Sequence, residues 1–251
     1  MRFGSQHIVE PGMRGDSFYR LLARALDLTI WRGELVGREN QPTSGPAVYV
    51  ANHAAALGPI AVCTSIPARL YPWVVADILD FGRAGPYLKK DFVEPQLHVP
   101  GWMSTPVASL LAAVAVRLLS GIECIPVSND KTLPQTYRLS GEYLAAGRSI
   151  LVFPEDPELP ADERSGMRHF KSGFARLGQV FFARTQENLR FFPVAVLPAQ
   201  RKVQLGQAVI FDPLNVASTE RIRISRLLES ALRLMLETQL LPPHRSLPTT
   251  P

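Results

Sequence analysis

The spacing of apolar residues in segment 16–32 is that of an α-helix with one apolar side and one charged side. The apolar side holds Phe18, Leu21, Leu22, Ala25 and Leu28, and the charged side holds Arg20, Arg24 and Asp27. This predicts an amphipathic N-terminal helix that either packs on the core or lies on a membrane surface. On a membrane, Arg20, Arg24 and Arg32 would face headgroups, and Phe18, Leu22 and Trp31 would lie towards the acyl chains.

Short apolar runs predict buried strands, and longer periodic runs predict the helices between them. Strands are expected at 47–51, 122–127, 149–153, 191–197 and 203–211, the last with Gly206 at a turn or bulge, and 71–76 is a further apolar run. Helices are expected at 57–65, 106–120, 135–146, 174–185 and 218–240, with Ser218 or Thr219 capping the last. The prolines, glycines and mixed charges of 82–100 predict a long irregular excursion.

Strands that alternate with helices predict a single α/β domain with a central, mostly parallel or mixed sheet covered by helices. We expect this domain to span 16–240. Residues 1–15, with three glycines and no apolar period, predict a flexible arm, and the prolines of 241–251 predict a flexible tail.

Composition narrows the class of protein and of partner. A hydrophobic fraction of 46% and a charged fraction of 20% over 251 residues are those of a globular domain. The net charge of +5 favours anionic partners such as membrane surfaces or phosphorylated molecules, whereas the absence of a basic run with interleaved aromatic residues disfavours nucleic acid. Cys63 and Cys124 form no cluster that would hold a metal or a disulfide framework. The apolar run 107–119 is too short to cross a bilayer, and without a signal-peptide pattern we expect a cytosolic chain.

Two predicted strands end in side chains that carry chemistry. Asn52 and His53 follow strand 47–51, and the second strand, 149–153, ends in Phe153-Pro154-Glu155. A histidine at the edge of a sheet is a candidate general base, and a glutamate at the same edge is a candidate orienting group. We expect both side chains on one face of the sheet, beside an apolar groove lined partly by helix 106–120.

These residues belong to a longer series of motifs in order along the chain. The series is Asn52-His53, the strand 121–127, Phe153-Pro154-Glu155, the segment 170–174, Phe192-Pro193-Val194 and the segment 205–209. Its order and spacing over residues 45–212 resemble those of the glycerophospholipid acyltransferases, the superfamily of lysophosphatidate and glycerol-phosphate acyltransferases. The resemblance implies that fold, and transfer of a fatty acyl group from acyl-CoA or acyl carrier protein to a hydroxyl of a lysophospholipid, glycerolipid or related acceptor. It also implies no bound cofactor, and a cytoplasmic protein peripheral on the inner face of the cell membrane.

In that chemistry the residue matching His53 takes the proton of the acceptor hydroxyl, with Asn52 and Glu155 in the same catalytic group. An aspartate five residues after the histidine holds the imidazole in the family, and this chain has Gly58 there. Asp77 and Asp80 are the nearest carboxylates that we nominate as replacements, and a backbone carbonyl or water is an alternative. Because Gly58 departs from the family, the second hypothesis is an acyltransferase-fold protein that binds lipid or acyl-carrier ligands without turnover.

The acceptor site also departs from the family. The family often places Gly-Thr-Arg after Phe-Pro-Glu, and an arginine after the strand matching 122–127, both of which grip a phosphate. Here Asp156-Pro157-Glu158 and Ser128-Asn129 stand in those places. The residues we assign to substrate binding are Phe153, Pro154, Arg164, Arg168, Lys171 and Gly173. Acidic neighbours oppose the three cations, so a less charged acceptor fits at least as well as lysophosphatidate.

Each feature also has a purely structural interpretation. His53 could be a satisfied histidine at a strand end, and Glu155 could be a capping or surface carboxylate. Helix 107–119 could be core rather than the wall of an acyl groove. The segment 170–173 could simply be a helix start with Ser172 as its cap.

Overall fold

The computed structural model describes residues 13–240, apart from 55–56, 90–92, 94–99 and 128–132. Helix α1 (Met13–Leu26) begins inside the predicted arm, so residues 13–15 are helical. The remainder of that arm and the predicted tail 241–251 lie outside the described residues. None of the helices in the described ranges is long and apolar enough to span a bilayer.

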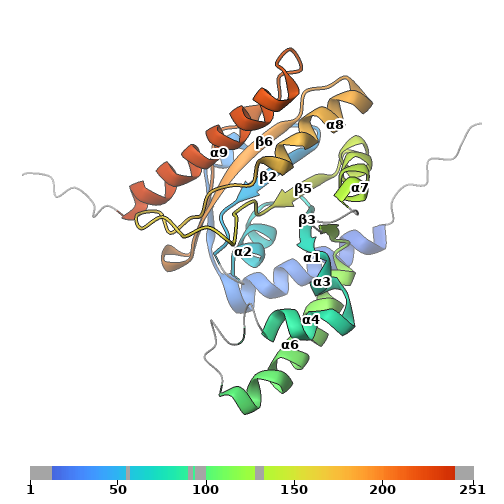
Figure 1. The fold of residues 1–251 in the computed structure, drawn as a ribbon, viewed down its shortest axis with the longest axis vertical. Helices are drawn as coiled ribbons and strands as arrows, with labels where there is room; N and C mark the ends of the chain where they lie inside the picture. The colour runs from blue at the N-terminus through green and yellow to red at the C-terminus, as the bar shows by residue number, and fades with distance from the viewer. Residues whose placement is uncertain (1–12, 55–56, 90–92, 94–99, 128–132, 241–251) are drawn as a thin grey trace, which may run out of the picture.

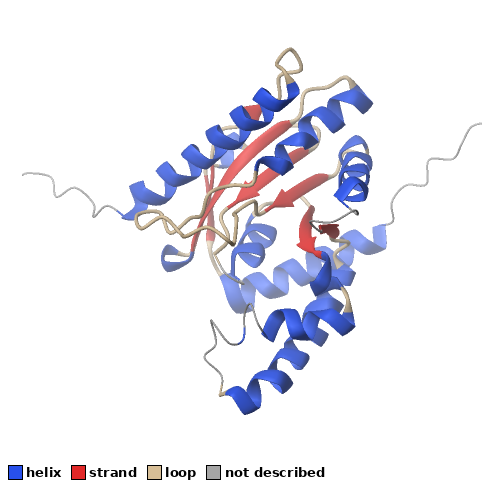
Figure 2. Ribbon diagram, viewed as in Figure 1, coloured by secondary structure: helices blue, strands red, loops and turns tan. Residues whose placement is uncertain are grey.

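The described strands form one eight-stranded mixed sheet (Figures 1 and 2). The strands run in the order β1 (Glu34–Val36), β7 (Lys202–Leu205), β6 (Arg190–Leu197), β2 (Ala47–Ala51), β5 (Ser149–Val152), β3 (Leu70–Val75) and β4 (Ile125–Val127), and β8 (Val209–Ile210) pairs with β6. Strands β2 to β6 are parallel to one another, whereas β7 and β8 run antiparallel to β6. The carboxyl ends of β2 and β5, which carry the predicted site, therefore meet at one edge.

Helices cover both faces of this sheet. Figure 1 shows α7 (Leu133–Ala145), α8 (Arg176–Thr185) and α9 (Ala217–Leu240) in front, with α1 and α2 (Leu57–Ser65) behind. Strand β2 explains the two cores, because its side chains alternate between faces. Val48 and Val50 join the core under α7 to α9, while Ala47, Tyr49 and Ala51 join the core under α1 and α2. The predicted single-domain α/β architecture is therefore confirmed.

A separate helical layer lies beyond β3 and β4. It consists of α3 (Ala76–Leu79), α4 (Phe81–Leu88) and α6 (Gly101–Gly121), which contact one another at the bottom of Figure 1. The irregular excursion predicted for 82–100 is wrong for 82–88, because Asp80 accepts hydrogen bonds from the backbone N–H groups of Gly82 and Arg83 and starts α4. Helix α6 begins at Gly101, five residues before the predicted start, with Pro106 inside it.

Several predicted boundaries move for local reasons. The strand expected at 203–211 is two strands, with Gly206 between them, where the backbone N–H of Gly206 donates to the Pro193 carbonyl. The strand expected at 122–127 begins only at Ile125, because α6 runs to Gly121. Helix α9 begins at Ala217, so Ser218 and Thr219 lie in its first turn. The turn η4 (Ser172–Ala175) has no side-chain cap, so Ser172 is not one.

Candidate functional site

The parallel pairing of β2 with β5 brings two segments together that lie a hundred residues apart. Val50 is opposite Val152, so Asn52 and His53 leave the sheet beside Phe153, Pro154 and Glu155. The carboxyl edge of a parallel sheet is where α/β proteins commonly bind their ligands. The sequence predicted this meeting, and the structure has it.

Asn52 joins this edge to strand β6. Its amide nitrogen donates to the Val196 carbonyl at 3.2 Å, and its amide oxygen accepts from the Val196 N–H at 2.7 Å. The side chain is buried, and it continues the ladder between β2 and β6 after the backbone of β2 has turned away. Asn52 therefore holds the backbone from which His53 projects, and its amide is occupied by this pairing.

The imidazole of His53 lies against the ring of Phe153. The two rings meet edge to face with centroids 5.3 Å apart. The residue as a whole is exposed, but the protein around the ring removes water from it. This desolvation lowers the pKa of His53 from its ordinary value of 6.5. The Glu155 carboxylate acts in the opposite direction and raises the pKa. The net lowering keeps the imidazole neutral at pH 7, which is the form that accepts a proton.

Glu155 contacts the backbone of His53 rather than its imidazole. One carboxylate oxygen accepts from the His53 backbone N–H at 2.5 Å, and the other accepts from the Arg168 backbone N–H at 2.8 Å. Glu155 therefore ties the end of β2 to the loop that follows β5. Its negative charge is still near enough to raise the pKa of His53 and so to favour the imidazolium.

Position 58 lies in the first turn of α2, beside this group. A Cβ atom on Gly58 would lie 3.5 Å from the Asn52 carbonyl oxygen and 3.5 Å from the Phe153 ring, which is ordinary contact. Gly58 is also absent from the described glycines with positive φ. Neither crowding nor backbone conformation therefore requires glycine here.

The two nominated replacement carboxylates do not contact His53 in the described part of the structure. Asp77 pairs with Arg83 at 2.9 Å, and Asp80 caps α4 and lies 3.7 Å from the same guanidinium. The nomination of Asp77 and Asp80 is therefore corrected: β3 carries them to the layer of α3 and α4. No described carboxylate forms an ion pair with the His53 imidazole.

The predicted substrate-binding residues divide between the strand end and the loop beyond it. Phe153 and Pro154 lie at the end of β5, where the Pro154 carbonyl accepts a hydrogen bond from the Lys171 backbone N–H. In the loop, the Gly173 carbonyl accepts a hydrogen bond from the Tyr137 hydroxyl. The cationic side chains are partly occupied. Lys171 pairs with Asp156 at 3.1 Å, and the Arg168 guanidinium donates to the Leu159 carbonyl, while Arg164 is exposed and its side chain has no partner among the described residues.

Helix α9 holds this loop in place, which the sequence did not reveal. Glu229 accepts from the Phe170 backbone N–H and pairs with the His169 imidazole, with Nδ1 and Oε1 2.7 Å apart. Arg233 donates to Ser165 and lies 3.5 Å from Asp162. These partners are about sixty residues away along the chain, and no local pattern marks them.

A cavity of about 200 Å³ opens beside Asn52 and Ala54. Its other described walls are apolar residues of β6 and α9 together with the turn η5 (Pro198–Gln200) and Ser165. No described residue of α6 lines it, so the predicted wall from helix 106–120 is wrong for this cavity. The reason is that α6 packs on α3 and α4, away from the strand ends. Within the described ranges no group of three or more His, Cys, Asp or Glu side chains is placed to hold a metal ion.

Comparison with known proteins gives a fold. No family model and no curated protein matches the chain. The crystal structure of the 1-acyl-sn-glycerophosphate (LPA) acyltransferase PlsC from Thermotoga maritima is similar, with a TM-score of 0.52 and 17% sequence identity. The match covers 91% of this chain and 81% of that chain. The chain therefore shares the mixed α/β fold of an acyltransferase.

Proposed function

We propose that this chain is an acyltransferase that moves a fatty acyl group from acyl-CoA or acyl carrier protein to a hydroxyl of a lysophospholipid, glycerolipid or related acceptor. The observation that carries the proposal is His53, an imidazole with a lowered pKa at the carboxyl edge of the sheet. Its chain neighbours Asn52 and Ala54 line a cavity. The likeness in fold to an acyltransferase supports it.

His53 acts as the general base in this reaction. The neutral imidazole takes the proton of the acceptor hydroxyl as that oxygen attacks the thioester carbonyl. A C–O bond forms, the C–S bond breaks, and the departing thiolate takes the proton from the imidazolium. No cofactor is consumed, because the thioester supplies the activated acyl group.

Glu155 and Asn52 act as positioning residues. Glu155 fixes the backbone of His53, and its charge stabilises the imidazolium through space, which is part of what an aspartate at position 58 would do. Asn52 fixes the same backbone against β6. Neither needs to touch the substrate for this role.

The occupied cations favour an acceptor of low charge. Lys171 is paired with Asp156 and the Arg168 guanidinium is bonded to a carbonyl, which leaves Arg164 as the accessible cation of this loop. The apolar wall that β6 and α9 give to the small cavity suits part of an acyl chain or of an uncharged acceptor, since burial is worth about 0.8 kcal/mol per methylene.

The test is incubation of the purified full chain with labelled acyl-CoA or acyl carrier protein and a panel of lysolipids and glycerolipids. We expect labelled ester from the wild type and about a hundredfold to ten-thousandfold less from His53→Ala, since the variant lacks the base. Arg226→Ala, an exposed residue of α9 outside the site, is the control for the effect of substitution. Equal activity in wild type and His53→Ala would overturn the histidine mechanism.

A second candidate function is binding of lipid or acyl-carrier ligands without turnover. The observation that favours it is the absence of a described carboxylate at the imidazole, with Gly58 where the resemblance expects one. An inert wild type that still binds acyl-CoA in a calorimetric titration would select this function.

A further inference from the structure

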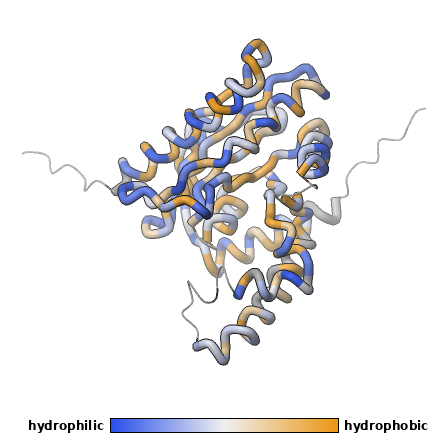
Figure 3. Tube along the Cα trace, viewed as in Figure 1, coloured by the Kyte–Doolittle hydropathy of each residue, from blue (hydrophilic) through white to orange (hydrophobic). Residues whose placement is uncertain are grey.

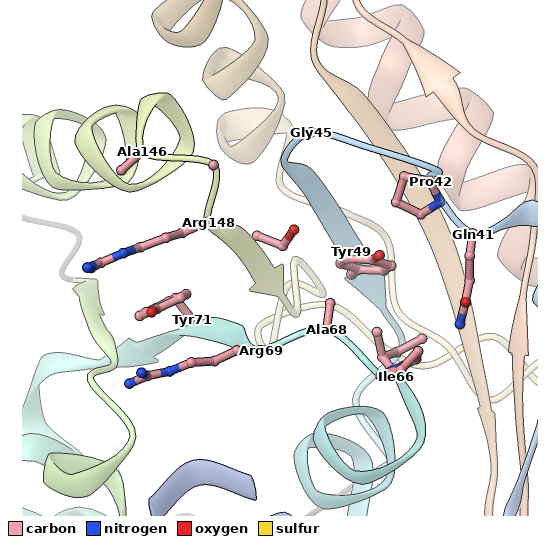
Figure 4. Close-up of a pocket in the computed structure, with 13 residues that line it drawn as sticks. Gln41, Pro42, Gly45, Tyr49, Ile66, Ala68, Arg69, Tyr71, Ala146 and Arg148 are labelled. Carbon is pink, nitrogen blue, oxygen red and sulfur yellow. The ribbon is translucent and has the colours of Figure 1, made fainter. Parts of the chain in front are cut away.

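A larger cavity lies at the opposite edge of the sheet from His53. It has a volume of about 530 Å³, within the range of small-molecule sites, and it opens where strands β2, β3 and β5 begin (Figure 4). Tyr49, on β2, is in its wall, and His53 is four residues further along that strand. At about 3.3 Å per residue the two are about 13 Å apart, so the cavity is separate from the candidate catalytic group.

One end of this cavity is cationic. Arg69 and Arg148 both stack on Tyr71, with guanidinium carbons 4.8 Å and 5.2 Å from the ring centroid, and Figure 4 shows the tyrosine between them. Glu123 pairs with Arg69 at 3.1 Å. No described carboxylate pairs with Arg148, and the described residues that line the cavity include no acidic side chain. The end therefore carries a net positive charge.

The other part of the cavity offers hydrogen-bond groups that nothing described satisfies. The amide nitrogen of Gln41 is buried and has no partner among the described residues. The Tyr49 hydroxyl likewise has no hydrogen-bond partner there, and burial raises the pKa of Tyr49 to about 12, so the hydroxyl keeps its proton. The Tyr49 hydroxyl therefore offers a donor to a molecule in the cavity, whereas the Gln41 nitrogen is enclosed by protein. Ile66 and Pro42 add apolar surface beside them.

We propose that this cavity binds a small organic phosphate, with the phosphate at Arg148 and the body of the molecule against Tyr49 and Ile66. Guanidinium groups present fork-shaped donors that match phosphate oxygens, and their stacking on Tyr71 holds them in place before the ligand arrives. The shared chemistry is a phosphate monoester, from a soluble metabolite or a lipid headgroup.

The test is calorimetric titration of the full chain with inorganic phosphate and with phenyl phosphate, at matched ionic strength. We expect saturable binding, tighter for phenyl phosphate because its ring adds contact with the apolar wall. Arg148→Gln should weaken binding at least about tenfold, and Tyr49→Phe should weaken it several-fold by removing one donor. Arg226→Gln, an exposed arginine on α9, is the control that should change nothing.

A second arm distinguishes the sources of phosphate. Vesicles of phosphatidylcholine with and without phosphatidic acid are mixed with wild type and Arg148→Gln. Retention that needs phosphatidic acid and Arg148, without binding of phenyl phosphate, assigns the site to a lipid headgroup. If Arg148→Gln does not fold, Arg148→Lys and Tyr49→Phe replace it. Absence of saturable binding to all three probes, or equal binding by the site variants and Arg226→Gln, would overturn the proposal. Since binding is read without acyl transfer, the result is independent of the proposed activity.

Discussion

His53 is subject to two opposing influences, and they give its titration a direction. Desolvation lowers the pKa of His53 and the Glu155 carboxylate raises it, with a net lowering. A general base works when neutral, so kcat/KM for acyl transfer should rise with pH through the pKa of His53 and then level off. We expect this acid limb to lie below the ordinary 6.5, measured as kcat/KM against pH in full-length protein.

Replacing Glu155 by glutamine removes its charge and one of its two backbone hydrogen bonds, because the amide NH2 cannot accept from the Arg168 N–H. Glu155→Gln keeps an acceptor for the His53 backbone N–H but removes the charge that raises the pKa, so the acid limb should move to still lower pH. We also expect a tenfold to hundredfold loss of kcat, about the value of one charged hydrogen bond. An acid limb that stays in place, in an active variant, would show that Glu155 does not act on the imidazole.

Gly58 can be tested directly, because a side chain fits there. Gly58→Ala should raise the free energy of unfolding by about 0.5–1 kcal/mol, since glycine is unfavourable inside a helix and a Cβ meets only ordinary contacts. Gly85→Ala in α4 is a matched control for the effect of helix propensity. Thermal or denaturant unfolding measures both.

The aspartate variant at the same position distinguishes the two candidate functions. If wild type is active, Gly58→Asp should change the rate little or lower it by competing for the imidazole. If wild type is inert, Gly58→Asp should restore measurable transfer provided that the acceptor pocket is intact. If Gly58→Ala lowers the free energy of unfolding, a side chain does not fit at position 58, and the expected results for both variants no longer hold.

The predictable part of the site is the part made by strand ends. His53 and Glu155 each follow an apolar run, and the resemblance implied that these two strand ends lie side by side, as the pairing of β2 with β5 has them. Asn52 pairing with Val196, and Glu229 pairing with His169, depend on distant contacts that no local pattern encodes. The nomination of Asp77 and Asp80 failed because the sequence does not give the order of strands in the sheet. Strand β3 lies two places from β2, and both carboxylates interact with Arg83.

The start of helix α9 is held by one buried carboxylate. Glu220 accepts hydrogen bonds from the Arg223 guanidinium, from the Asp212 backbone N–H and from the Asn215 amide. These bonds lower the pKa of Glu220 to about 2, and the bond from Arg223 has the largest effect. The side chain is inaccessible to solvent. It thereby joins α9 to the chain that follows β8.

Glu220 should make the protein sensitive to acid. Its pKa is about 2 when folded and 4.5 ordinarily, so its contribution to stability is complete above pH 4.5 and is lost as pH falls towards 2. We expect Glu220→Gln to lower the free energy of unfolding at pH 7 by about 2 kcal/mol, allowing for screening of the part-exposed Arg223. Glu142→Gln, whose exposed pair with Arg138 is worth little, is the control. Equal pH dependence in both variants would contradict this role.

Elements with a strong apolar period were the ones that sequence could assign. The helices at 57–65 and 176–185 and the strand at 47–51 agree with prediction almost to the residue. Strand β1 was missed because its three residues are too short for any period, and its partner is β7. Helix α4 was missed because Gly82, Gly85 and Pro86 predict a loop, whereas the Asp80 cap and packing on α6 overcome that preference.

Helices α1 and α6, and the turn 27–31 that follows α1, carry exposed apolar side chains. Leu21 is 70% exposed and Trp102 is 80% exposed, with Phe18, Leu28 and Leu110 also exposed. Figure 3 shows few strongly hydrophilic positions along α6. The predicted lipid-facing role of Trp31 is wrong, because this residue is buried in the core and its ring N–H donates to Ser65.

We expect helices α1 and α6 to bind anionic membranes reversibly. Full-length protein should float with vesicles that contain phosphatidylglycerol at low salt and less at high salt, since Arg20 and Arg24 on α1 are exposed and their attraction is screened. Leu21→Asp should reduce flotation several-fold by removing an apolar contact. Leu234→Asp on α9 is the control, because Leu234 is similarly exposed. Absence of flotation at low salt, or an equal loss of flotation in both variants, would contradict membrane binding through α1.

The pairing of β1 with β7 sets an order of events during synthesis. Glu34 lies opposite Lys202, so this edge of the sheet cannot form until about 170 further residues have been made. Contacts between such distant segments close late in folding. Helix α1 contacts α2 and α6, and until those helices have been made its apolar side is available to whatever surface lies near the ribosome. The growing chain could therefore meet the membrane before it has finished folding.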